Sequence, residues 1–277
     1  MLGLITRLKN DHEHGSREIA QFFLLDCRAW CSHHLVDPEQ FLDFLNQVET
    51  ARQSMVIFQN ITHRLRKLIS LDREGLGRRI VNEINLLLKE LALSERLILE
   101  RTRVFCQSRN IHSVLTHSRS STVESVLKQL GKSKLLSSVF CTESRPLNEG
   151  AALANALTPY IHTTLIVDAL ADSIVRQCDC VFLGADAMDK QGYVLNKIGS
   201  RLIALSAKDH GIPIICLVGS MKIHPTKRVA SLPLELQPSA ELGHPLNNNL
   251  SVINQYFEVV EKDLFSAIIS DQEVIHL

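Results

Sequence analysis

The sequence has no long apolar run, no excess of charge of one sign and no glycine-rich nucleotide-binding motif. Its apolar runs stay well below the roughly 18 residues that a membrane-spanning helix needs, so we expect no membrane span. Lysine plus arginine and aspartate plus glutamate number 30 each, and zero net charge gives no general attraction to nucleic acid. Neither a P-loop nor a GxGxxG motif occurs. We therefore predict no direct contact with nucleic acid or membrane, no nucleotide hydrolysis and no dinucleotide binding.

Cysteine is present, but its pattern favours neither disulfides nor a metal site. There are seven cysteines, an odd number, and Cys141, Cys180 and Cys216 lie inside apolar runs. This pattern is typical of reduced thiols in a cytoplasmic protein. Cys27 and Cys31 are one helical turn apart, and no second pair has zinc-like spacing. We predict a cytoplasmic location, no secretory leader, no metal and no other cofactor.

Proline and glycine are scarce in the first hundred residues, where Pro38 is the only proline. Apolar residues recur there with helical spacing over 17–30, 41–68 and 78–106, and residues 70–77 are typical of a turn. We interpret residues 1–108 as an N-terminal all-helical domain.

After Asn110, short apolar runs alternate with helical patterns. The predicted strands are 111–116, 137–141, 164–167, 180–183 and 212–218. The predicted helices are 121–130, 149–157, 169–177 and 199–210, and 231–249 is typical of a long loop. Buried strands in alternation with helices indicate right-handed βαβ units. The predicted fold class is therefore α/β, with residues 109–277 forming a Rossmann-like, parallel-sheet domain.

The segment 116–122 follows a predicted strand and precedes a helix. In an open parallel sheet, ligands bind at the carboxyl ends of the strands. Ser121 and Glu124 have capping-box spacing, which predicts a helix N-terminus here. Its free N–H groups, together with His117, Ser120 and Arg119, would bind an anion such as phosphate. The alternative interpretation is that these residues form only a serine-rich helix cap beside a solvated arginine.

Two further segments follow the strand 180–183. Asp186 could orient or deprotonate a sugar hydroxyl there, although a turn aspartate that bonds its own backbone is the simpler interpretation. In residues 196–200, which we expect to enter the next helix, Lys197 supplies a positive charge and Gly199 would allow close approach of a ligand. A lysine near a helix start is usually only solvated.

These segments resemble a known family. It contains the α, β and δ subunits of translation initiation factor 2B, methylthioribose-1-phosphate isomerase and ribose-1,5-bisphosphate isomerase. The main match is residues 184–225, which read GADAMDKQGYVLNKIGSRLIALSAKDHGIPIICLVGSMKIHP. Upstream, in the same order as in the family, lie ARQSM at 51–55, VLTHS at 114–118 and VFCTESRP at 139–146. The co-occurrence of these motifs over most of residues 50–225 is far more specific than any one of them.

The resemblance implies a helical N-terminal domain, a Rossmann-like C-terminal domain that forms most of a homodimer interface, and a phosphosugar pocket at the strand ends. A larger assembly is also compatible with it. It further assigns roles by position. These are an acid–base aspartate at Asp186, substrate contacts at Asn196 and Lys197, and phosphate or sugar contacts at Arg52, Arg145 and Lys222. Residues 15–17, GSR, correspond to a glycine-containing phosphate loop.

One departure bears on catalysis. The isomerases have a cysteine directly after the histidine of the "TH" element, where this chain has Ser118. A thiol with a pKa of about 8.5 can exchange a proton near neutrality, whereas a serine hydroxyl needs a strong partner base. Our first hypothesis is therefore a non-catalytic, regulatory or scaffold subunit that binds a phosphosugar, a nucleotide monophosphate or a protein partner.

The alternative hypothesis is an active aldose–ketose isomerase for a phosphorylated ribose, either ribose 1,5-bisphosphate or methylthioribose 1-phosphate. Asp186 would be its base, and Ser118 or Cys141 its acid. A third hypothesis is a vestigial pocket in a protein that uses only its dimer interface. Guanine nucleotide exchange by this chain alone is not expected, because no part of it resembles the subunit type that carries that activity.

Overall fold

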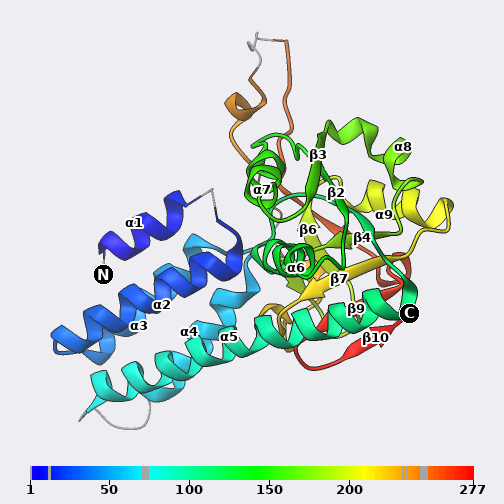
Figure 1. Cartoon of the computed structure of the whole chain (residues 1–277). Coiled ribbons are helices and arrows are strands. Elements are labelled where there is room, and N and C mark those ends of the chain that lie inside the picture. Colours follow the sequence, from blue (N-terminus) through cyan, green and yellow to red (C-terminus); the bar gives the residue numbers. More distant parts are fainter. Residues whose placement is uncertain (1, 12–13, 70–74, 233, 235, 244–248) are drawn as a thin grey trace.

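The computed structural model describes residues 2–11, 14–69, 75–232, 234, 236–243 and 249–277. Helices make up the N-terminal part, and a mixed α/β region follows, which confirms the predicted fold class (Figure 1). Among the helices of these residues, none combines the length and the apolar character that crossing a membrane requires.

Five helices are present among the described residues of the N-terminal part. They are α1 Leu2–Asn10, α2 Ser16–His33, α3 Pro38–Ala51, α4 Val56–Ile69 and α5 Leu76–Arg109. The sequence did not predict α1, and it merged α3 and α4 into one helical stretch. The chain leaves the helical conformation at Arg52 (φ −143°), where no proline or glycine marks the break. In the predicted turn at 70–77, residues 70–74 lie outside the described residues.

Helix α5 links the two parts of the molecule. Its buried residues from Leu76 to Leu91 pack into the helical core, whereas Ile98, Phe105 and Cys106 pack into the core on one face of the sheet. The boundary between residues 108 and 109 therefore stays a prediction, since this helix contributes to both cores.

The main sheet has seven strands in the order β10-β9-β7-β4-β1-β2-β3. Their bounds are β1 Ser113–Thr116, β2 Ser138–Thr142, β3 His162–Ile166, β4 Cys180–Leu183, β7 Ile214–Val218, β9 Ala267–Ser270 and β10 Val274–His276. All neighbours pair in parallel except β10 with β9. The five predicted strands correspond to β1, β2, β3, β4 and β7, with ends shifted by up to two residues; β9 and β10 were not predicted.

Each face of this sheet buries its own apolar core, since successive side chains on a strand point to opposite faces. On β4, Phe182 packs with α5 and with helices α6 Ser121–Lys132 and α7 Glu149–Leu157. Val181 packs on the other face, with α8 Ala171–Val175 and α9 Ser200–Asp209. The buried strands therefore read as continuous apolar runs, as in other sheets covered on both faces.

A second, antiparallel sheet of three strands lies beside the first. It contains β5 Ala187–Met188, β6 Val194–Lys197 and β8 Phe257–Val260. Asn196 and Lys197 therefore lie on β6, a strand that was not predicted, and the segment 196–200 enters α9 at Ser200, as expected. They pair with Glu258 and Phe257 of a strand about sixty residues further along the chain, which a local pattern cannot reveal.

Two other local predictions change in detail. The cap of α6 is Ser120, whose side chain accepts a hydrogen bond from the Val123 N–H, and not Ser121. Glu124 does not complete a capping box, because its carboxylate bonds Arg119 and Lys128. Within the predicted loop at 231–249, the described residues include a short 3-10 turn at Ser239–Leu242, which projects away from the sheet (Figure 1). Residues 233, 235 and 244–248 lie outside the described residues.

Candidate active site

The topology places a crevice between the carboxyl ends of β1 and β4. From β1 the chain continues to β2 and β3 on one side, and later through β4, β7 and β9 on the other. The strand order thus reverses between these two neighbours, where open α/β sheets bind ligands. His117 and Ser118 follow β1, and Asp186 follows β4 after two residues, so separate predicted segments meet at this point.

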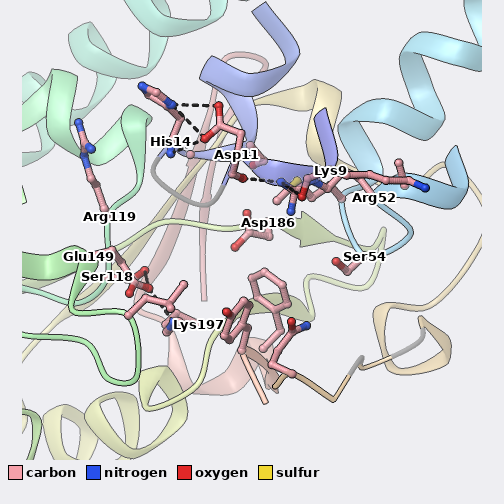
Figure 2. A pocket seen from close by; sticks show the side chains of 18 residues that line it. Lys9, Asp11, His14, Arg52, Ser54, Ser118, Arg119, Glu149, Asp186 and Lys197 are labelled. Carbon is pink, nitrogen blue, oxygen red and sulfur yellow. Dashed lines mark hydrogen bonds and ion pairs between the residues drawn. The ribbon is translucent and has the colours of Figure 1, made fainter. Parts of the chain in front are cut away.

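A cavity of about 210 Å³ opens there (Figure 2). Its lining joins the helical part, the ends of the main sheet and the small sheet. The lining residues are Lys9, Asp11, His14, Gly15, Ser16, Ala51, Arg52, Ser54, Met55, Ser118, Arg119, Leu147, Glu149, Asp186, Lys197, Gln237, Tyr256 and Phe257. Five of the ten residues predicted from the sequence are among them, namely Arg52, Ser118, Arg119, Asp186 and Lys197.

Asp186 presents a half-buried carboxylate to this cavity (Figure 2). Its backbone N–H donates to the Leu195 carbonyl at 2.9 Å, which ties the turn after β4 to the small sheet. The carboxylate itself receives no hydrogen bond from any described residue. Asp186 is therefore not a turn aspartate that bonds its own backbone, and its oxygens are available to a ligand.

Ser118, Glu149 and Lys197 form a linked group on another wall. The Ser118 hydroxyl donates to Glu149 Oε1 at 3.0 Å, and Lys197 Nζ lies 2.7 Å from the same oxygen. Lys197 is almost fully buried and also lies 4.7 Å from the centre of the Tyr256 ring. Ser118 adopts a left-handed backbone conformation (φ 64°), and its N–H donates to Ser144 Oγ at 2.8 Å. These contacts fix the direction of the Ser118 hydroxyl.

The N-terminus of α2 lines part of the cavity through Gly15 and Ser16. Its cap is Gly15, which has no side chain to satisfy the first N–H groups. Ser16 is 2% exposed, and its hydroxyl has no hydrogen-bond partner among the described residues. A Cβ at position 15 would lie 3.1 Å from the Ser121 N, so glycine allows α2 to approach the start of α6. Free N–H groups at a helix start attract a phosphate.

Both cavity arginines also make contacts within the protein. Arg52 donates to the carbonyls of Leu8 (2.9 Å), Lys9 (3.4 Å) and Asp11, which are the last carbonyls of α1 and the chain just after it. Arg119 donates to Glu124 Oε2 at 3.0 Å. The positive charges therefore line the cavity while holding its walls in place.

Five predicted site residues lie outside the cavity lining. His117 is buried and joins Thr142 Oγ1 (2.6 Å) to the Ile198 carbonyl (2.8 Å). Since a carbonyl only accepts, Nε2 carries the proton and Nδ1 accepts from Thr142. Burial lowers the pKa of His117, although the hydrogen bond to Ile198 opposes this shift. His117 therefore positions the end of β1 against the turn before α9.

The other four make comparable internal contacts. Asn196 donates to Ser200 Oγ at 2.9 Å, and Ser120 caps α6. Lys222 is buried and donates to the Ala185 carbonyl at 2.7 Å, next to Asp186; burial lowers its pKa, and the charge of Asp186 partly opposes this shift. Arg145 is exposed and donates to the Leu242 carbonyl at 3.0 Å. Cys141, the other candidate acid, lies buried in β2, and burial raises its pKa to about 12.

The cavity residues that were not predicted from the sequence include Glu149, His14, Tyr256 and Lys9. Glu149 lies three residues after Pro146, the last residue of the TESRP motif, and this proximity is the one signal in the sequence. Tyr256 precedes a strand that was not predicted, and Lys9 lies on the unpredicted α1.

Known proteins share the sequence pattern and the fold of this chain. The model of the initiation factor 2 subunit family covers residues 31–276. The chain belongs to this family. Over 167 residues it is 33% identical to ribose 1,5-bisphosphate isomerase of Methanocaldococcus jannaschii, a match that covers 59% of this chain and 54% of that protein. Over 158 residues it is 35% identical to methylthioribose-1-phosphate isomerase of Naegleria gruberi, covering 53% and 42% respectively.

The matched part thus spans about half the length of these curated relatives. Two solved structures of the family have the same fold as this chain. The translation initiation factor eIF-2B of Pyrococcus horikoshii has a TM-score of 0.84 at 22% identity, covering 99% of this chain and 96% of that one. The tetrameric eIF2B-beta2-delta2 complex of C. thermophilum contains a chain with a TM-score of 0.69 at 20% identity, covering 99% and 89%.

Proposed function

We propose that this member of the family is a sugar-phosphate isomerase that converts a phosphorylated ribose from its aldose to its ketose form. The single observation that carries the proposal is the Asp186 carboxylate, which faces the cavity with no hydrogen bond from the described residues. Two curated relatives named as isomerases of this class support it. The sequence alone favoured a non-catalytic binding protein over an isomerase, and these relatives now favour the isomerase.

The phosphate would bind at the N-terminus of α2. Gly15 leaves the first N–H groups of this helix uncapped, and the buried Ser16 hydroxyl lacks a partner among the described residues. A phosphate oxygen would satisfy both kinds of donor, and the helix dipole would stabilise its charge. His14 and Arg52 also line the cavity.

Isomerisation of the sugar then requires proton transfers at defined atoms. Opening the ring adds a proton to the ring oxygen, and formation of the ketone removes the proton of the C2 hydroxyl. Asp186 can give the first proton when it starts as the carboxylic acid, and the resulting carboxylate can accept the second, which returns it to its starting state. In between, C2 must lose a proton and C1 must gain one. The Ser118 side of the cavity would carry out this second exchange.

A non-catalytic binding role remains the second candidate, because Ser118 replaces the cysteine of the isomerases. In that case the same cavity would hold a phosphorylated sugar or a nucleotide monophosphate as a regulatory ligand. Both candidates share the phosphate end of the cavity and differ only in turnover.

Phosphorus NMR separates the two candidates. Purified protein is mixed with ribose 1,5-bisphosphate and, separately, with methylthioribose 1-phosphate. New resonances that grow with time support the isomerase, provided that Asp186→Asn abolishes them and Asp43→Asn, at an exposed position on α3, does not. Broadened but unchanged resonances would instead support the binding role. Spectra identical to those of the free ligands would contradict both.

We also propose that the chain forms a homodimer through its C-terminal part. Exposed apolar side chains lie at the edge strand β3, just after it, and on α9. They are Leu165, Val167, Leu170, Leu202 and Leu205. A second copy that covers these side chains would remove their apolar surface from water. The tetrameric eIF2B-beta2-delta2 complex supports assembly in this family.

We also propose a cytoplasmic location, where the unpaired cysteines would stay reduced.

A further inference from the structure

Glu149 is a second carboxylate in the cavity, and the acid–base role proposed for Asp186 does not involve it. It begins α7, three residues after the end of the TESRP segment, and its side chain is 16% exposed. Its Oε1 accepts both the Ser118 hydroxyl and the Lys197 ammonium. Its Oε2 is buried and has no hydrogen-bond partner among the described residues.

This arrangement supplies what an isolated serine lacks. A serine hydroxyl does not release its proton near neutral pH unless a base accepts it. Here the hydroxyl already donates to a carboxylate at 3.0 Å. The left-handed backbone at Ser118 and its N–H bond to Ser144 hold the hydroxyl in this direction. Non-glycine residues in this conformation are uncommon and concentrate at functional sites.

We propose that Ser118 and Glu149 form a proton relay that replaces the thiol of the related isomerases. The inference rests on the proposed isomerase function. Ser118 Oγ takes the proton from C2 of the ring-opened sugar while its own hydroxyl proton passes to Glu149. The electron pair of the broken C2–H bond forms the C1–C2 double bond, and the electron pair of the C1–O π bond moves onto the C1 oxygen. The protons then return along the same path to C1, so Ser118 and Glu149 end as they began, and Asp186 accepts the C2 hydroxyl proton.

Lys197 has a matching role in this relay. While Glu149 is ionised, Lys197 balances its charge at 2.7 Å. When Glu149 holds the proton, Lys197 loses this partner, and its ammonium can stabilise the negative charge that develops on the sugar. Its contact with the Tyr256 ring, at 4.7 Å, keeps the ammonium in the cavity throughout.

The test compares steady-state kinetics of the full chain and its variants on the substrate that the wild type turns over. Glu149→Gln keeps the shape of the side chain and removes the base. We expect kcat to fall about 100-fold and KM to change less than about threefold, because general acid–base catalysis contributes in this range. Ser118→Ala should show the same loss, and the double variant no larger one. Glu83→Gln is the matched control, since Glu83 has a similar exposure of 17% in an ion pair with Arg64 in the helical part.

Two further variants separate a relay from a structural role. Glu149→Asp keeps the carboxylate and should recover much of kcat. In a Ser118→Cys background, the thiol carries the proton itself, so Glu149→Gln should cost less than about tenfold there. Thermal melting of each variant verifies folding.

The outcomes are distinct. The relay is wrong if Glu149→Gln matches Glu83→Gln in kcat, if it raises only KM, or if the losses of the two single variants multiply in the double variant. A wild type that binds sugar phosphates without turnover would instead overturn the proposed isomerase function, and the relay with it.

Discussion

Gly150 is the position where one added methyl group should disturb the candidate site most. It is the second residue of α7, between Glu149 and the rest of the helix. A Cβ built there would lie 1.9 Å from the Thr142 carbonyl oxygen and 2.7 Å from Ser144 Oγ. Thr142 bonds His117, and Ser144 bonds the Ser118 N–H. Gly150→Ala should therefore push α7 away from the end of β2 and displace Glu149 from Ser118.

The size of the effect follows from this geometry. An ordinary contact begins near 3.4 Å, so helix and strand must separate by about 1.5 Å. The first clash is with a backbone oxygen, which no side-chain rotation can relieve. Overpacking of this kind costs about 1–3 kcal/mol, and alanine returns at most about 1 kcal/mol of helix propensity. We expect a net loss of about 2 kcal/mol, or roughly 4–8 °C in Tm for a chain of this size.

Differential scanning calorimetry of Gly150→Ala, wild type and Gly3→Ala measures this effect. Gly3 is the control because it also lies in a helix, α1, and a Cβ there has nothing within 4 Å. Helix propensity alone would raise the Tm of both variants, whereas the clash lowers that of Gly150→Ala only. A Tm of Gly150→Ala equal to or above that of the wild type would refute the reasoning.

Two further predictions concern pH and assembly. Burial lowers the pKa of His117 below its ordinary value of about 6.5, so the unfolded chain takes up a proton that the folded chain resists. The free energy of unfolding should therefore be highest above about pH 6.5 and fall as the pH drops below it. In thermal melts between pH 7.5 and 5.5, His117→Gln should reduce this dependence of stability on pH. An unchanged dependence would contradict the assignment to His117. Leu202→Glu places a charge on the proposed dimer face, where Leu202 is 71% exposed, and should yield monomers in light scattering. Leu35→Glu, at a position 99% exposed in the helical part, is the control and should leave the dimer intact; dimers of both variants would exclude this face.

Much of the fold could be predicted because its signals are local. The strand 180–183 and the helix 149–157 have the predicted bounds, since each is a continuous run with one period of apolar residues. The strands β6, β8, β9 and β10 were missed. Each is only three or four residues long, and β6 exists because Val194 and Leu195 pair with Val260 and Val259. Pairing between distant segments leaves little trace in a local pattern.

The candidate site divides in the same way. The turns after β1 and β4 could be placed from the rule that ligands bind at strand ends, and Asp186 and Ser118 do line one cavity. The roles of Lys222 and His117 could not be predicted by this rule. Their hydrogen-bond partners are the backbone carbonyls of Ala185 and Ile198, and every residue type has the same backbone carbonyl, so the sequence gives no sign of these contacts. Residue type determines the chemistry that a side chain can perform. It does not determine whether that side chain already forms a hydrogen bond to a buried backbone group.

The sequence by itself determined the fold class, the family resemblance and the exchange of a thiol for a hydroxyl at position 118, because periodicity and residue identity are properties of the chain. Only the tertiary structure decided which groups meet. Ser118, Glu149 and Lys197 are separated by 31 and 48 residues along the chain, yet all three share one carboxylate oxygen. That contact depends on where β1 and β6 end and where α7 begins in space. The packing of the two sheet faces fixes these positions, and no single segment encodes them.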